Sequence, residues 1–364
     1  MNVGKGLQNA LAKRRDMKSL AAISFAIIAL QTPSCTQDQV GQMARLQALL
    51  QSQDFALEMA TSLDAAYYRG LGQTPPPFLT SQEQTATTQK SVREEKIAIN
   101  LAGFYAVESG MGVIAESTKE APLQILDSLA SGARSKDDML LLARFANATW
   151  KAGQPFRSLN RITRDNFRPA ALLSEGDLKK DFVQIVAAAR LLRDNMQDVR
   201  GQSASQQLSR LQALMQSRDF AVEMAMFLDM AYYRGQGQMP PPFLKPEEET
   251  ATTTKSAREE KIAINLAGFY AVEAGIGVIS ERTTDLPLDI LDSIAKGTRS
   301  QQDMLLLARF ANATWKAGQP FRSLSRITRD NFRPAVLLSD DELKKDFDQI
   351  RAAAATLADA MRRK

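Results

Sequence analysis

The stretch MLLLARFANATWKAGQPFRSL, residues 139–159, occurs a second time without change at residues 304–324. It places Trp150 and Trp315, the two tryptophans of the chain, at equivalent positions 165 residues apart. The matching continues outward at the same offset and without a gap, so that residues 42–196 return as residues 207–361. A direct repeat of this kind indicates an internal duplication.

The repeat predicts the domain organisation. Each copy of about 155 residues is long enough to bury a core of its own, and it far exceeds the roughly 20–50 residues of a solenoid unit. We therefore expect a leader (residues 1–34) followed by two tandem homologous helical-bundle domains, residues 35–200 and 201–364. Gly201 and the small residues after it form the expected hinge.

Composition excludes several kinds of chemistry. The chain has 364 residues, no histidine and a single cysteine, Cys35, which precedes both repeats. Without histidine it lacks the commonest general base and the commonest metal ligand. A zinc site of Cys and His, an intrachain disulfide and a Ser-His-Asp or Cys-His nucleophile are all excluded. We expect no metal and no cofactor.

The positive charge is concentrated at the N-terminus. The net charge is +5 and the isoelectric point is 9.2, but the first 34 residues hold five cations and one anion. The rest of the chain is nearly neutral, so nucleic-acid binding is not expected.

The leader contains the uncharged stretch LAAISFAIIAL, residues 20–30. It is too short to span a bilayer, which takes roughly 20 residues, and it fits the apolar core of a secretory signal, which runs roughly 7–15 residues. Cations precede it, and Ser34-Cys35 with a polar stretch follows. This arrangement resembles a bacterial lipoprotein signal, in which the cysteine becomes the lipidated first residue. The resemblance, with Thr32 where the family prefers Leu, implies export and makes Cys35 a candidate for lipidation.

Apolar spacing and capping signals predict an all-α fold of about six helices in each copy. Ser135 with Asp138 is a capping-box-like start, Pro122 and Pro155 suit first helical positions, and Gly110, Gly112 and Gly153 are expected to end or interrupt helices. No stretch alternates as a half-buried strand does. In the first copy the expected helices cover about residues 38–69, 91–110, 122–130, 136–153, 155–168 and 174–200.

Arginines recur at spacings of four, three and four along the helix expected over residues 155–168. On an α-helix they share an arc of roughly 60°. Guanidinium groups on one face can hold phosphate or carboxylate groups in bidentate fashion. The candidate anion-binding residues are Arg157, Arg161, Arg164 and Arg168, with Arg322, Arg326, Arg329 and Arg333 in the second copy.

The alternative is a solvated face, or arginines paired internally with Asp165 and Asp181. Aromatic residues at helical spacing are expected in the core rather than on ligands. They are Phe145, Trp150, Phe156 and Phe167, the pair Tyr67-Tyr68 and the pair Phe104-Tyr105.

Carboxylates are the acid–base groups that remain for catalysis. Glu94, Glu95, Glu108, Glu116, Asp127 and Asp138 could supply a glycosidase-like pair, although surface charge explains them as well. The enzyme interpretation is therefore the weakest one.

The copies differ within their first helices. Thr61, Ser62 and Ala65 correspond to Met226, Phe227 and Met230, which widens the apolar surface of the second copy. Contact between the copies, self-association or a protein partner is expected there.

Together these patterns favour an exported, lipid-anchored, non-enzymatic binding or structural protein of the cell envelope, in the periplasm or at the outer membrane. Its partner would be an anionic ligand or another protein. A cytosolic helical adaptor is the first alternative, and a carboxylate-dependent glycan hydrolase is the second.

Overall fold

The computed structural model describes residues 37–363, so the predicted leader and Cys35 lie outside the described residues. The elements of the first repeat are α1 (Gln37–Leu50), α2 (Gln53–Gly70), α3 (Ser81–Thr85), β1 (Thr87–Ser91), α4 (Val92–Thr118), α5 (Pro122–Ser131), α6 (Lys136–Arg157), η2 (Leu159–Thr163), η3 (Ala170–Leu172), α7 (Glu175–Lys179), α8 (Phe182–Asp194) and η4 (Gln197–Val199).

The elements of the second repeat are α9 (Ala204–Met215), α10 (Arg218–Gly235), α11 (Pro246–Glu249), β2 (Thr252–Ser256), α12 (Ala257–Thr283), α13 (Pro287–Ala295), α14 (Gln301–Arg322), η5 (Leu324–Thr328), η6 (Ala335–Leu337), α15 (Asp340–Leu343), η7 (Lys344–Asp346) and α16 (Phe347–Arg362). The all-α prediction is confirmed. The expectation of no strand is wrong for β1 and β2, which pair with each other. Their sequences, TTQKS and TTTKS, are polar throughout and so show no hydrophobic alternation.

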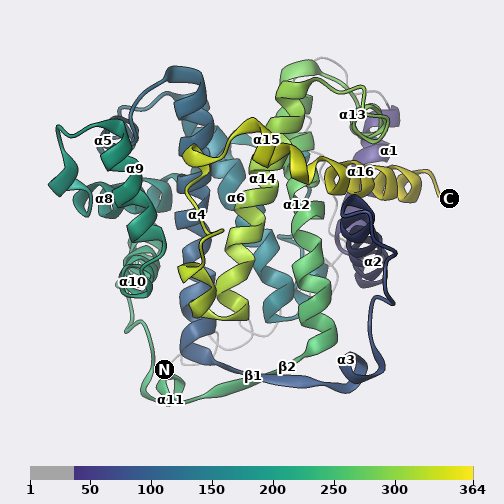
Figure 1. The fold of residues 1–364 in the computed structure, drawn as a ribbon, viewed down its shortest axis with the longest axis horizontal. Coiled ribbons are helices and arrows are strands. Elements are labelled where there is room, and N and C mark those ends of the chain that lie inside the picture. Colours follow the sequence, from purple (N-terminus) through teal and green to yellow (C-terminus); the bar gives the residue numbers. More distant parts are fainter. Residues whose placement is uncertain (1–36, 364) are drawn as a thin grey trace, which may run out of the picture. The chain divides into compact units, whose positions relative to one another are not determined.

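Four long helices, α4, α6, α12 and α14, pack against one another at the centre (Figure 1). Among the described residues, α4 and α12 are long and apolar enough to cross a membrane by length and composition alone, but 78% of each apolar window is buried inside the protein. Burial on every side is typical of core helices.

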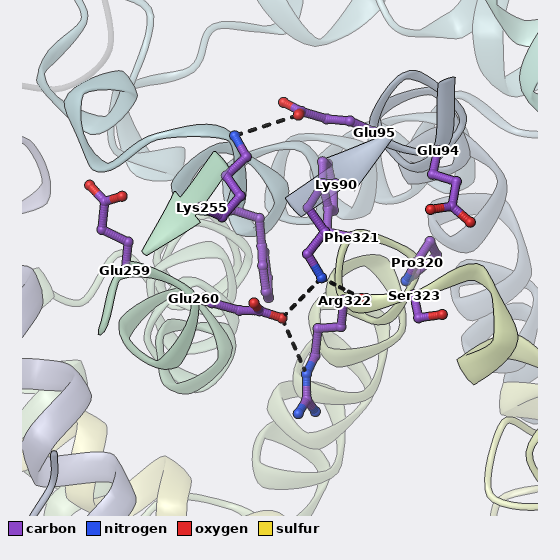
Figure 2. Close-up of a pocket in the computed structure, with 11 residues that line it drawn as sticks. Lys90, Glu94, Glu95, Lys255, Glu259, Glu260, Pro320, Phe321, Arg322 and Ser323 are labelled. Atoms are coloured by element: carbon purple, nitrogen blue, oxygen red, sulfur yellow. Dashed lines mark hydrogen bonds and ion pairs between the residues drawn. The ribbon is translucent and has the colours of Figure 1, made fainter. Parts of the chain in front are cut away.

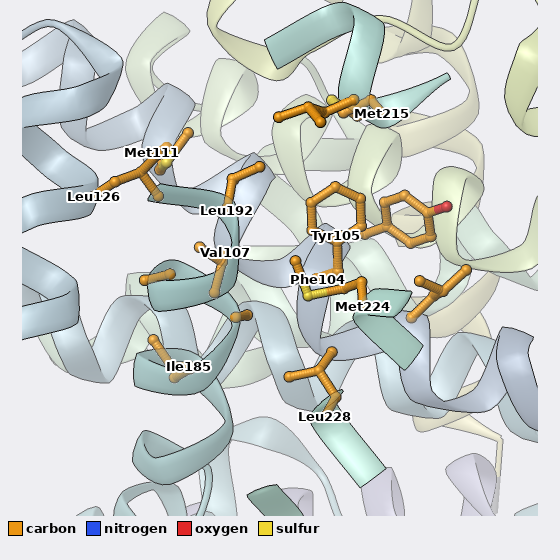
Figure 3. Packing of buried hydrophobic residues seen from close by; sticks show 14 of the residues in the cluster. Phe104, Tyr105, Val107, Met111, Leu126, Ile185, Leu192, Met215, Met224 and Leu228 are labelled. Atoms are coloured by element: carbon orange, nitrogen blue, oxygen red, sulfur yellow. The ribbon is translucent and has the colours of Figure 1, made fainter. Parts of the chain in front are cut away.

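The outer helices are exchanged between the repeats. Helix α2 of the first repeat packs on α12 and α16 of the second, and α10 of the second packs on α4 and α8 of the first. Figure 1 shows α2 beside α16 on one side and α10 beside α8 on the other. In the core, Phe104 and Tyr105 of α4 pack with Met224 and Leu228 of α10 (Figure 3).

Equivalent residues meet across a pseudo-two-fold axis. Phe145 stacks on Phe310 with ring centroids 4.0 Å apart, and Phe156 stacks on Phe321 at 5.5 Å. In the antiparallel β1–β2 pair the central residues are Gln89 and Thr254, again 165 apart. Self-contacts of this kind are the mark of an isologous two-fold interface.

The expected pair of independently folded domains is not what the contacts show. The described residues from Asp38 onward form one compact unit, and each large apolar core combines side chains of both repeats. The helix pattern predicted the amphipathic faces, but it could not distinguish the two nearly identical partners available to each face.

Glycines account for one error in the predicted helix ends. Helix α4 continues through Gly110 and Gly112 to Thr118. A Cβ atom on Gly110 would lie 2.1 Å from Cδ2 of Leu142, which is fully buried, and one on Gly112 would lie 3.0 Å from Ala335. These glycines permit close helix packing rather than ending the helix.

The same explanation applies to α6, which passes through Gly153 and Pro155 to Arg157. A Cβ atom on Gly153 would lie 2.9 Å from the Phe321 ring. The helix expected over residues 155–168 therefore does not exist. The first expected helix is also divided, because Ser52 caps a new helix by accepting a hydrogen bond from the Phe55 N–H.

Two fully buried ion pairs join the repeats. The Lys151 ammonium lies 2.6 Å from the Glu273 carboxylate, and Lys316 lies 2.7 Å from Glu108, the equivalent pair. Each glutamate also accepts a backbone N–H, from Ala170 or Ala335. Burial lowers the pKa of both lysines, and the facing carboxylates oppose this effect.

The exchanged packing predicts that cutting the connection between the repeats does not separate them. We expect a protein with a protease site inserted at Gln202, once cleaved, to elute from a gel-filtration column as one particle of about the intact mass of 40.1 kDa. The physical reason is that both cores draw side chains from both fragments. Elution of two separate half-size species would contradict the exchange, and a denaturing gel of the same sample controls for complete cleavage.

Candidate functional site: two clefts between the repeats

The arginines singled out from the sequence are not on one helical face. Arg157 ends α6, Arg161 lies in η2, and Arg164 follows that short helix. Arg157 approaches Glu95 at 3.6 Å, and burial followed by the charge of Arg161 lowers its pKa. Arg168 is paired internally, as the alternative drawn from the sequence has it, but its partner is Asp177, 3.0 Å away, and not Asp165 or Asp181.

The second repeat repeats this arrangement. Arg322 approaches Glu260 at 4.0 Å and Arg333 pairs with Glu342 at 2.9 Å. Burial, then the charge of Arg329, lowers the pKa of Arg326. Three arginines of each set are thus electrostatic neighbours, and the fourth is neutralised by a carboxylate.

Five of the six carboxylates considered for glycan hydrolysis, all except Glu94, are held in ion pairs within residues 37–363. Besides the buried Glu108, Glu116 lies 2.7 Å from Arg309, Asp127 lies 2.9 Å from Arg200, and Asp138 lies 2.7 Å from Arg134. Their engagement with different cations gives no support to a shared catalytic pair.

Beneath the β1–β2 pair is a small cavity of about 20 Å³ near the pseudo-two-fold axis. Lys90 donates to the Arg322 carbonyl at 2.5 Å and approaches Glu260 at 3.5 Å, while Lys255 approaches Glu95 at 3.5 Å (Figure 2). A volume of this size holds about one water molecule, so the cavity is a structural junction rather than a ligand site.

Two much larger clefts are equivalent by the repeat. Cleft 1 has a volume of about 790 Å³ and cleft 2 of about 950 Å³, in the upper part of the range of ligand sites, roughly 300–1,000 Å³. Residues that line cleft 1 include Glu95, Lys96, Asn100, Asn147, Trp150, Arg157, Asn166, Asp177, Lys180, Asp181, Gln184, Asp229, Tyr232, Tyr233 and Glu248. Cleft 2 has Glu260, Lys261, Asn265, Asn312, Trp315, Arg322, Asn331, Glu342, Lys345, Asp346, Gln349, Asp64, Tyr67, Tyr68 and Glu83 at the equivalent positions.

Neither repeat builds a cleft alone. In cleft 1, α4 and α6 of the first repeat supply Asn100 and Trp150, and α10 of the second repeat supplies Tyr232 and Tyr233. The tyrosine rings meet edge to face at 5.5 Å, and Tyr232 remains 49% exposed. The sequence placed the corresponding Tyr67-Tyr68 pair in the core, which is wrong for Tyr67, 50% exposed, whereas Phe145 and Phe167 are core residues as expected.

Each cleft contains a carboxyl group without a partner. No side chain in residues 37–363 hydrogen bonds to Asp181, and burial raises its pKa to about 7, against a smaller lowering by Lys180. Burial raises the pKa of the equivalent Asp346 to about 6. Each aspartate precedes a helix whose dipole favours the ionised form, so the loss of hydration outweighs the dipole. Unpaired, strongly shifted acids in clefts are typical of functional sites.

Further polar groups in the clefts lack hydrogen-bond partners within the described residues or form long hydrogen bonds. The Asn147 and Asn312 side-chain oxygens are buried without a hydrogen-bond partner in the part of the chain described. Asn100 donates to Asp229 at 3.4 Å, and burial raises the pKa of this aspartate. Lys96 lies 5.1 Å from the centre of the Phe243 ring. Buried polar groups normally find partners, so these atoms favour a polar ligand.

Phe227, Met226 and Met230, the larger apolar residues of the second repeat, lie partly in the core and partly on the surface. Phe227 packs against the core that contains first-repeat side chains, as expected for contact between the copies. Met226 is 43% exposed. Together with Val183 and Phe182, Phe227 also borders a groove of about 450 Å³ between α8 and α10. Met230, on the same helix, is half-buried.

Within residues 37–363, no group of three or more acidic, histidine or cysteine side chains is arranged to hold a metal ion. No protein-family model matches the chain, and no curated protein and no solved structure shows significant similarity to it.

Sequence reasoning missed the residues that make the clefts. Helical periodicity separates buried from exposed faces, but it does not show that α10 crosses to the other repeat. The sequence predicts Asp181 as a counter-ion for arginine, and it places Tyr67-Tyr68, the equivalent of Tyr232-Tyr233, in the core. The signal in the sequence for these cleft residues was a helix face with both polar and aromatic side chains, and such faces are common on protein surfaces without a binding site.

Proposed function

We propose that this is a non-enzymatic binding protein that takes one ligand in each of two equivalent clefts. The observation that carries the proposal is the twin set of large clefts, each with one tryptophan, two tyrosines and an unpartnered aspartate. Each lining combines three aromatic side chains with several charged and amide side chains, and convergent polar groups in a large concave site are typical of ligand binding. The sequence-based assignment to the cell envelope, with Cys35 as lipid anchor, is part of the same proposal.

Ligand binding can be measured with the two native tryptophans, since each lies in one cleft. In Trp315→Phe, fluorescence reports cleft 1, and in Trp150→Phe it reports cleft 2. We expect a ligand to change the emission of both variants and to raise the melting temperature, because binding to the folded state alone is stabilising. A ligand purified with the protein that stabilises it without perturbing either tryptophan would place binding elsewhere.

The leader is tested separately by mass spectrometry of the mature N-terminus. A lipidated Cys35 supports export and anchoring, and an intact Met1 supports the cytosolic adaptor. The result leaves the cleft proposal unaffected, because the residues that line the clefts begin at Leu63.

Anion binding by the arginines is a second candidate function, favoured by the clustering of Arg161 and Arg164 beside Arg157. Replacing Arg161 and Arg164 by serine is expected to weaken binding to an anionic ligand and to reduce its salt dependence. Unchanged affinity for an anion that the native protein does bind would refute this role.

A further inference from the structure

Resting on the proposed cleft function, we propose that each cleft recognises an organic cation, a ligand whose ammonium group lies between the unpaired aspartate and the aromatic side chains. In cleft 1 these are Asp181, Trp150, Tyr232 and Tyr233. In cleft 2 they are Asp346, Trp315, Tyr67 and Tyr68.

The balance of charge favours a cation. Carboxylates outnumber basic side chains among the lining residues, five to four in cleft 1 and five to three in cleft 2. Of the cleft 1 arginines, Arg168 is paired with Asp177 at 3.0 Å, whereas Arg157 only approaches Glu95 at 3.6 Å, and its buried Nε has no hydrogen-bond partner within residues 37–363. Lys180, 73% exposed, also approaches Asp177, at 3.4 Å. An anionic ligand would add negative charge to clefts in which acidic side chains are already in slight excess.

The raised pKa of the cleft aspartates also favours a cationic ligand. Burial raises the pKa of Asp181 to about 7, because the loss of hydration of the ionised group outweighs the attraction of Lys180. A ligand ammonium group would provide that counter-ion and donate hydrogen bonds to the carboxylate. Lys180, whose charge acts on Asp181, approaches Asp177 at 3.4 Å instead, and Asp181 forms no ion pair within residues 37–363.

Aromatic faces supply the second half of the site. Trp and Tyr rings attract ammonium groups through their π electrons, and the attraction is strongest where water is excluded. The protein already uses this interaction at the cleft margin, where Lys96 lies 5.1 Å from the Phe243 ring and Lys261 lies 5.5 Å from Phe78. Neutral amide side chains such as Asn147 and Gln184 can bind further polar groups of the ligand.

The test titrates the full chain with spermidine, an organic polycation, and with tetraethylene glycol, chitotetraose, citrate and magnesium ions as comparison probes. In Trp315→Phe we expect spermidine to change the Trp150 emission, and Asp181→Asn in that background to weaken binding at least tenfold, because one lost charged contact costs about 1.4 kcal/mol or more. Asp346→Asn should have that effect only in Trp150→Phe. Asp330→Asn, an exposed position outside both clefts, is the control.

The outcomes separate the ligand class from the cleft function. An equal response to magnesium, or spermidine binding that is unaffected by Asp181→Asn, would overturn recognition of an organic cation. If only chitotetraose or citrate perturbs the tryptophans, the clefts bind ligands but the proposed class is wrong. If no probe perturbs either tryptophan, both the organic cation and the cleft function are rejected.

Discussion

Replacing Lys151 by methionine is expected to reduce the free energy of unfolding by about 3–5 kcal/mol, the usual cost of removing one partner from a buried ion pair. Methionine preserves most of the volume of the lysine stem but removes the ammonium group. The Glu273 carboxylate, whose side chain is completely buried, then loses its counter-ion at 2.6 Å. Urea unfolding measures the loss, and Lys316→Met should cause a similar one because Glu108 is left in the same state.

Two variants test this explanation. Lys151→Met combined with Glu273→Gln should recover much of the stability, since glutamine is uncharged and its oxygen can still accept the Ala170 N–H. Lys136→Met breaks an equally short but exposed pair with Glu175, 2.7 Å apart, and should cost less than about 1 kcal/mol. If Lys151→Met were no more damaging than Lys136→Met, the buried pair would not have the structural role assigned to it.

Replacing Asp181 by asparagine is expected to stabilise the protein at pH 8 by about 4 kcal/mol and to have almost no effect at pH 3. The pKa of this carboxyl is about 7 in the folded protein, against a usual value of 3.8. Below the usual value the carboxyl is protonated in both the folded and the unfolded chain. As the pH rises to 7 only the unfolded chain loses the proton, so folding becomes less favourable, and above 7 the full cost remains.

The measurement is a series of urea unfolding curves of the native protein and the variant between pH 3 and pH 8. The stability difference should grow across this range and level off above pH 7. Asp346→Asn should show a smaller gain that levels off near pH 6, and Asp330→Asn, an exposed position, should shift stability by less than about 0.5 kcal/mol. A gain for Asp181→Asn that is the same at pH 3 and pH 8 would show that burial of charge is not its cause.

Local sequence signals predicted most of the helix starts. Ser135 caps α6, Ser174 caps α7, and Pro122 opens α5, as their side chains and backbone restrictions suggest. These signals depend on hydrogen bonds within a few residues, so the surrounding fold does not change them.

The predicted helix ends at glycine and proline were wrong, because these residues are required by contacts with distant parts of the chain. Gly153 is required by the Phe321 ring of the other repeat, and Gly110 by Leu142. The continuation of α6 through Pro155 removed the helix on which the arginine face depended. The predicted site, four arginines on one helical face, is therefore not formed. The candidate site in the structure is a pair of clefts that exist only because the repeats exchange helices.

The sequence by itself determined the helical class, the beginnings of the helices and the repetition at a spacing of 165 residues, since all three reside in local chemistry or in direct comparison of the copies. Only the tertiary structure decided that α2 and α10 pack on the opposite repeat and that two mixed clefts result. The apolar face of each of these helices finds nearly the same partner surface in either copy. Local pattern therefore cannot select between them, and the choice rests on the path of the intervening chain and on contacts across the pseudo-two-fold axis.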